Sequence, residues 1–144
     1  MVKIACVFPN TNNIGDYVQT LPLYETFSGC EIVDRENLAN INGQAKQLVL
    51  NGWYCHYPEN VFPIDPGFST HVIGFHLASS AKQTFIEKQL QTWKNQRKEV
   101  GCRDRSTYQF MKQNGLIDAY LSFCPSILNI GMGKWNPDRK VVVD

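Results

Sequence analysis

Short apolar runs, rich in β-branched residues, recur along the chain and are separated by polar or helix-forming stretches. Most of these runs are continuous rather than alternating, which is typical of strands that are covered on both faces of a sheet. The pattern predicts a mostly parallel sheet with helices on both faces. The predicted strands are Val2–Phe8, Cys30–Asp34, Gln47–Gly52, Thr70–His76, Glu99–Arg103, Ala119–Phe123 and Lys140–Asp144.

A helical pattern of apolar positions lies between the first two strands. Val18, Leu21 and Phe27 recur at intervals that bring them near one face of a helix beginning at Ile14. Pro22 removes a hydrogen bond from the helix interior, so we expect the helix to kink or restart there.

Two further helices are expected later in the chain. Ser79 or Ser80 can cap the first of them, and Asp104 is the cap candidate for the second, which ends at Asn114-Gly115. Strands that alternate with helices predict right-handed βαβ units and a single α/β domain over residues 1–144. The apolar face of the first of these helices carries Phe85, Ile86, Gln89, Leu90 and Trp93.

Residues 56–69 form the longest stretch without a helix or strand pattern. Three prolines and a glycine in it are expected to exclude regular structure. A loop of this length in a small domain is often functional, although it can also be an ordered crossing of the surface.

Composition and charge exclude several classes of protein. With 43% hydrophobic and 19% charged residues, the chain is typical of ordinary globular proteins. A net charge of +1 without a basic stripe argues against nucleic acid as the partner. No run resembles a signal peptide or a membrane span, so the cytoplasm is the expected location. The five cysteines are widely spaced, which predicts neither a disulfide framework nor a zinc site, and no metal or cofactor is expected.

Ligands of parallel sheets bind beyond the carboxyl ends of the strands, and three polar corners are predicted at that edge. The first follows Phe8, where Asn13, Gly15 and Asp16 precede an apolar helix. It suits either a solvated turn with a helix cap or a ligand cradle, in which Asp16 would be a weak general base. A single glycine is no phosphate-binding loop, so nucleotide binding is poorly supported.

The second corner follows the third strand and contains Asn51, Gly52, Trp53 and His56. The indole of Trp53 could stack on a sugar ring or pack beneath the long loop. His56 could act as an acid or base near neutral pH, whereas core or surface roles are expected for His71 and His76.

The third corner follows the fifth strand. Arg103 could bind a carboxylate or phosphate through two parallel hydrogen bonds, or it could pair with the neighbouring Asp104. Ser106 could cap the next helix or face a ligand. These two interpretations carry equal weight.

The ordered segments "NIGDYVQTLPL", "LVLNGWY", "VGCRDRSTYQFMKQNG" and "AYLSFCPSILN" resemble the polysaccharide pyruvyl transferase family. The resemblance implies a Rossmann-like half of a two-domain, glycosyltransferase-like fold. It also implies polysaccharide biosynthesis, in which pyruvate passes from phosphoenolpyruvate to a glycan sugar as a ketal. The final "VVVD" is similar to the strand that leads to the family's interdomain crossing.

The resemblance favours a role in the cleft for the first corner but does not show which residues are catalytic. Asp16 and His56 are the catalytic candidates, the latter from its position in the loop alone. The resemblance marks substrate-binding candidates at all three corners, and the 144 residues correspond to the family's N-terminal half only. A C-terminal partner domain or self-association is therefore expected. The alternative is a non-catalytic glycan-binding or scaffold domain. The substrate-binding candidates are Asn13, Gly15, Gln19, Asn51, Gly52, Trp53, Arg103, Asp104 and Ser106.

Overall fold

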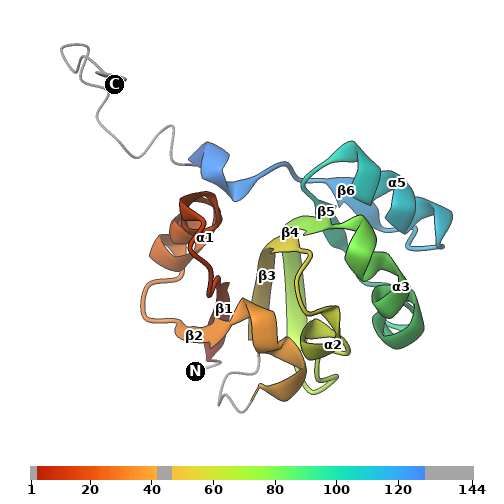
Figure 1. The fold of residues 1–144 in the computed structure, drawn as a ribbon, viewed down its shortest axis with the longest axis horizontal. Helices are drawn as coiled ribbons and strands as arrows, with labels where there is room; N and C mark the ends of the chain where they lie inside the picture. Colours follow the sequence, from red (N-terminus) through yellow and green to blue (C-terminus); the bar gives the residue numbers. More distant parts are fainter. Residues whose placement is uncertain (1–2, 42–46, 129–144) are drawn as a thin grey trace.

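Six parallel strands form one sheet in the computed structural model, which describes residues 3–41 and 47–128 (Figure 1). The strand order is β2-β1-β3-β4-β5-β6, and every neighbouring pair is parallel. The predicted parallel α/β fold is confirmed and is Rossmann-like; the expected strand Lys140–Asp144 lies outside the described residues. The strands are β1 (Ile4–Phe8), β2 (Glu31–Asp34), β3 (Gln47–Tyr54), β4 (Ser69–Leu77), β5 (Val100–Cys102) and β6 (Ala119–Leu121).

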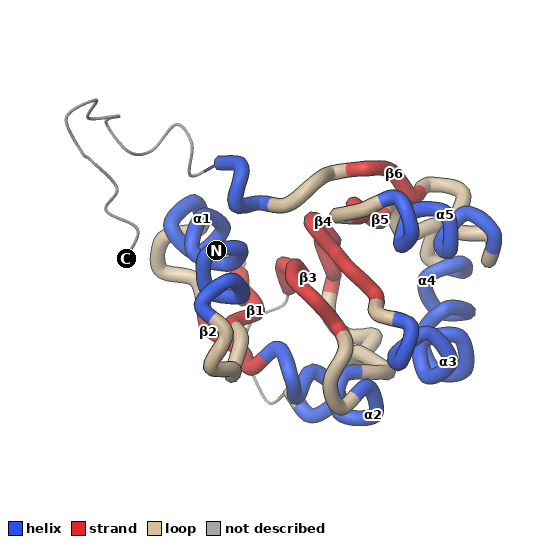
Figure 2. The backbone as a smooth tube through the Cα atoms, turned by 45° about the horizontal axis from the view of Figure 1, so that its top comes forward, coloured by secondary structure: helices blue, strands red, loops and turns tan. Residues whose placement is uncertain are grey.

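Helices cover both faces of the sheet, as the apolar runs predict. Figure 2 shows α1 on one side of the strands and the other labelled helices on the opposite side. A short 3-10 turn, η4 (Pro125–Leu128), lies beside α1. None of the described helices is long and apolar enough to cross a membrane. The helices are α1 (Ile14–Thr26), α2 (Pro58–Val61), α3 (Lys82–Phe85), α4 (Gln91–Asn95) and α5 (Arg105–Gln113).

The larger core lies between the sheet and the helices α2 to α5, and it is rich in aromatic rings. Phe85 and Trp93 are fully buried there, whereas Ile86, expected on the same face, is 37% exposed. A π-helical turn, η3 (Ile86–Leu90), joins α3 to α4. Its wider turn changes which of these residues point toward the core. Gln89 is buried on this face because its Oε1 accepts a hydrogen bond from the Ile64 amide at 2.7 Å.

Helix α1 differs from its prediction in its buried face. It continues through Pro22 as one helix, so of the two outcomes expected at this proline, a kink or a restart, the restart does not occur. Its buried side carries Asp16, Thr20 and Leu23, while Val18 is 41% exposed. The apolar pattern missed this face because two of its buried side chains are polar and find partners inside the protein.

The other comparisons with the prediction concern where the short helices begin and end. Ser80 does not cap the helix that follows it, because its hydroxyl donates to the Cys55 carbonyl at 3.0 Å. The expected loop 56–69 contains the one-turn helix α2, and the prediction of no regular structure there is wrong. Pro58 stands in its first turn, where a missing N–H costs nothing. The cap of α5 by Asp104 is confirmed, and Asn114 ends that helix as predicted.

Candidate functional site at the carboxyl edge of the sheet

The three predicted corners meet around Gln19 on α1. The strand β3 continues to Tyr54, so Asn51, expected at its end, lies within it. The side-chain amide of Asn51 donates to the Gln19 carbonyl at 3.3 Å. The Arg103 guanidinium, just beyond β5, donates to Gln19 Oε1 at 2.6 Å. Asn51 also lies 3.4 Å from the hydroxyl of Thr20. Residues separated by more than eighty positions therefore form one edge, because parallel strands end on the same side.

Beneath this edge, a buried ion pair joins α1 to the end of β2. Arg35 Nη1 lies 3.2 Å from Asp16 Oδ1, and the two side chains are 2% and 4% exposed. Thr11 donates to the second carboxylate oxygen of Asp16 at 3.0 Å. The close approach of Arg35 requires Gly52, whose φ is +100°, since a Cβ there would lie 3.0 Å from Nη1.

The charge of Arg35 is compensated on two sides. Burial acts to lower the pKa of Arg35, but hydrogen bonds to Asp16 and Glu36 together outweigh it and raise that pKa. The Asp16 carboxylate therefore helps to hold this corner together through Arg35 and Thr11. Its catalytic role, expected from the sequence, stays a prediction.

A histidine–carboxylate pair lies at the ends of β4 and β5. His76 Nδ1 is 2.6 Å from Asp104 Oδ2, but this buried nitrogen has no partner of hydrogen-bond geometry among the described residues, so the contact is mainly electrostatic. The same carboxylate caps α5 through the amide and hydroxyl of Thr107, at 2.9 and 3.0 Å. Burial acts to raise the pKa of Asp104, but these hydrogen bonds and His76 lower it overall. Asp104 therefore pairs with His76, whereas Arg103 bonds Gln19.

His76 is a candidate site residue that sequence reasoning missed, because it lies within the apolar strand β4, where a core or surface role was expected. Burial is the main cause that lowers the pKa of His76, and the nearby charge of Arg103 acts in the same direction. A single sequence does not show which strands pair, or in which register. Phe75 on β4 pairs with Cys102 on β5, so the next residues, His76 and Arg103, lie side by side.

Aromatic rings surround this pair on the side of β3. The Trp53 indole is 37% exposed and makes an edge contact with the His76 ring, with centroids 6.0 Å apart. The His56 ring lies 6.2 Å from the same indole and 6.5 Å from the ring of Tyr57, which is itself 70% exposed. The second corner thus provides a partly open aromatic surface beside the histidine.

The remaining predicted residues lie at helix starts. Asn13 caps α1, with its side-chain oxygen accepting from the Gly15 amide at 3.0 Å. Ser106 is exposed in the first turn of α5, where Asp104 already provides the cap. For Asn13 and Gly15 the structure therefore favours the helix-cap interpretation, and the groups that come together are Gln19, Asn51 and Arg103.

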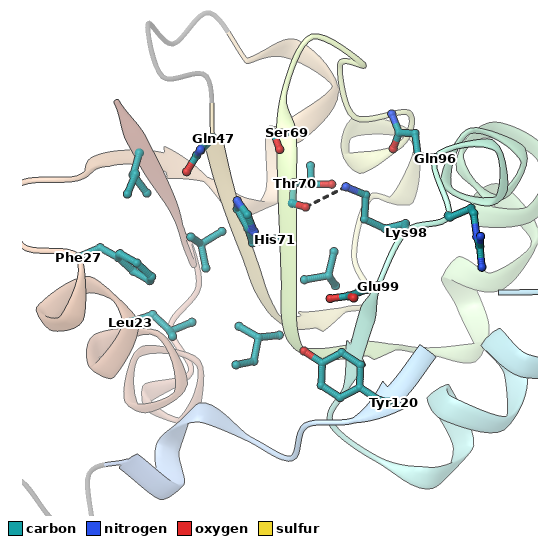
Figure 3. Close-up of a pocket in the computed structure, with 15 residues that line it drawn as sticks. Leu23, Phe27, Gln47, Ser69, Thr70, His71, Gln96, Lys98, Glu99 and Tyr120 are labelled. Atoms are coloured by element: carbon teal, nitrogen blue, oxygen red, sulfur yellow. Dashed lines mark hydrogen bonds between the residues drawn. The ribbon is translucent and has the colours of Figure 1, made fainter. Parts of the chain in front are cut away.

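A pocket of about 620 Å³ lies away from this edge, against the sheet face that α1 partly covers (Figure 3). Leu23 of α1 and Phe27, just after this helix, form one wall, and Lys98 donates to the Thr70 carbonyl at 3.0 Å on the opposite side. None of the site residues expected from the sequence lines it.

No group of three or more histidine, cysteine or acidic side chains within residues 3–41 and 47–128 is arranged to hold a metal ion. Comparisons of the chain with protein-family models, curated proteins and solved structures found no match. The function of the carboxyl edge is therefore inferred from its geometry and from the motifs that form it.

Proposed function

We propose that this chain provides the sugar-binding half of a pyruvyl transferase, which moves pyruvate from phosphoenolpyruvate to a glycan as a ketal. The observation that carries the proposal is the meeting of Arg103, His76 and Trp53 at one edge of the sheet. A guanidinium suits a carboxylate or phosphate, an imidazole suits proton transfer, and an indole suits a sugar ring. The motif resemblance supports the same chemistry.

The reaction needs these groups for stated reasons. One sugar hydroxyl adds to the central carbon of phosphoenolpyruvate, and the methylene carbon takes up a proton to become a methyl group. A second hydroxyl then replaces the phosphate at that carbon, and its proton leaves with the phosphate. A base for the hydroxyl and a cation for the donor's charged groups lower the barriers of these steps. Arg103 has guanidinium N–H groups besides the Nη1 that bonds Gln19.

The proposal predicts ketal formation that depends on Arg103. Phosphoenolpyruvate and methyl glycosides are mixed with the chain, alone and together with the C-terminal half of a pyruvyl transferase, and phosphate release and ketal mass are measured. Arg103→Met is expected to lower kcat/KM about tenfold or more, or about 1.4 kcal/mol of transition-state stabilisation. Arg105→Met, an exposed position two residues later, is the matched control and should retain activity.

Two results would contradict this assignment. Absence of both ketal and phosphate in every mixture would remove the transferase proposal. Saturable binding of glycosides without turnover would favour the non-catalytic glycan-binding alternative, which the exposure of Trp53 and Tyr57 also supports.

An exposed apolar stripe on α1 supports the proposed partner. Ile14 is 78% exposed, and Val18 and Leu21 follow it at helical spacing with 41% exposure each. We propose that this stripe is an interface, with a partner domain or with a second copy of the chain.

The interface predicts self-association that depends on α1. Light scattering of the chain alone should show a mass that rises with concentration, and Leu21→Ser combined with Ile14→Ser should give a monomer. Ile117→Ser, at an equally apolar exposed position beyond α5, is the control and should leave association unchanged. A clean monomer of the unaltered chain over a wide concentration range would contradict self-association and leave only a partner domain for the stripe.

A further inference from the structure

We infer that Nε2 of His76 holds a hydroxyl of the bound sugar and takes its proton, and that Asp104 is the positioning residue for this imidazole. The inference rests on the proposed sugar-binding function and names the atom at which the proton is received.

The position of Asp104 selects the nitrogen. Its carboxylate lies 2.6 Å from Nδ1 of His76, and Nδ1 is buried. A negative charge at this point favours the tautomer with its proton on Nδ1, which leaves the lone pair on Nε2. The His76 side chain as a whole is 27% exposed, and no described residue hydrogen-bonds Nε2. The free lone pair therefore belongs to the accessible nitrogen.

The charges around the ring keep it neutral near pH 7. Asp104 raises the pKa of His76, while burial, which is the largest influence, and the positive charges of Arg103 and Lys82 lower it. These groups come from the corner after β5 and from α3, and the side of β3 contributes Trp53 and the imidazole of His56. The net pKa lies below the ordinary value of about 6.5. A neutral imidazole accepts a hydrogen bond, whereas the protonated one does not.

Trp53 can hold a sugar ring so that one of its hydroxyls lies beside His76. Its indole stands at 90° to the His76 ring with centroids 6.0 Å apart. A sugar ring that packs against the exposed part of the indole brings its hydroxyls to the neighbouring imidazole. In the second step, the proton of the second hydroxyl passes to Nε2 as that oxygen bonds the central carbon and the bond from that carbon to the phosphate oxygen breaks. The imidazolium then releases this proton to the departing phosphate, while the proton that made the methyl group was taken up in the first step.

Binding measured against pH tests this without requiring turnover. Methyl β-galactopyranoside and methyl α-mannopyranoside are titrated into the chain between pH 5 and 8, and the amide and imidazole NMR shifts give Kd. A proton on Nε2 prevents the imidazole from accepting the hydrogen bond of the hydroxyl, so affinity should fall by up to about tenfold as the pH drops through the pKa of His76 and then level off. The imidazole shifts should report titration of His76 at the same pH midpoint.

Three variants separate this role from a structural one. His76→Asn keeps an amide near Asp104 but has no group that titrates in this range, so binding should become independent of pH. Asp104→Asn retains the helix cap, since asparagine caps as well as aspartate, and should move the midpoint to lower pH. His71→Asn, at an exposed position earlier on β4, should leave the pH dependence unchanged.

The outcomes distinguish this inference from the proposed function. Glycoside binding that is independent of pH in the unaltered chain, or pH dependence that survives His76→Asn, overturns the role of His76 and leaves the sugar site in place. If binding depends on pH through His76 but no ketal forms, the hydrogen bond from the sugar to His76 is supported and the transferase reaction is contradicted. If neither glycoside shifts any resonance, both proposals are overturned.

Discussion

Arg35→Met is expected to lower the free energy of unfolding by about 3–5 kcal/mol. Methionine fills much of the same space but removes both hydrogen bonds to Asp16, whose side chain is only 4% exposed. The carboxylate then remains buried without the cation that compensates it, which is the costly half of breaking a buried ion pair. Equilibrium unfolding in urea, followed by far-UV circular dichroism, measures the loss.

Two comparisons identify the cause of that loss. Arg97→Met removes an ion pair with Asp118 at 3.7 Å, but the Arg97 side chain is 76% exposed, and a change of only about 0–1 kcal/mol is expected. Combining Arg35→Met with Asp16→Asn also removes the negative charge that Arg35→Met leaves buried without a cation. The double variant should therefore recover part of the lost free energy of unfolding. Equal losses for the Arg35 and Arg97 variants would show that the buried pair does not hold the corner together.

The strands could be predicted because they are covered on both faces. β3 and β4 are apolar through most of their length, and the predicted starts and ends agree with the structure to within about two residues. Burial from both sides leaves few polar positions, so a single sequence shows such strands clearly. The shared edge of the three corners follows from parallel pairing alone, and the hydrogen bonds of Gln19 agree with it.

The buried face of α1 could not be predicted in the same way. Apolar periodicity selects Val18 and Leu21, but the helix buries Asp16 and Thr20 because Arg35 and Asn51 provide partners for them. Polar groups are buried only where such partners exist, and those partners come from distant parts of the chain. Local rules therefore fail at the carboxyl edge of the sheet, while they succeed in the strands.

His76 shows the same limit for the site. Nothing near it in sequence distinguishes it from His71, five residues earlier on the same strand. Its partner Asp104 is brought close by the pairing of β4 with β5, which is not visible in a single chain read from end to end. Once the strand order is known, the residues that follow paired strand ends are the natural candidates.

Phe85→Ala is expected to cost about 3–5 kcal/mol of unfolding free energy, because it removes the ring at the centre of the larger core. Phe85 is 0% exposed, and its ring centroid lies 5.2 Å from that of Trp93 and 5.4 Å from that of Phe62. Phe110 and Phe75 surround it at 6.2 and 6.5 Å, so the cavity would open among side chains that cannot all move inward. Urea unfolding measures the loss, and near-UV circular dichroism reports the environment of Trp93.

Ile86→Ala is the matched control, because it deletes a large apolar side chain from the next position of the same helical segment. Ile86 is 37% exposed, and alanine is the better helix former, so a loss of about 1 kcal/mol or less is expected. The apolar periodicity alone predicts similar losses at the two positions, whereas the π-helical turn predicts a large difference. Equal destabilisation by the two substitutions would mean that Ile86 is buried and that the helix continues without the turn, which would also change how α4 presents Trp93 to the sheet.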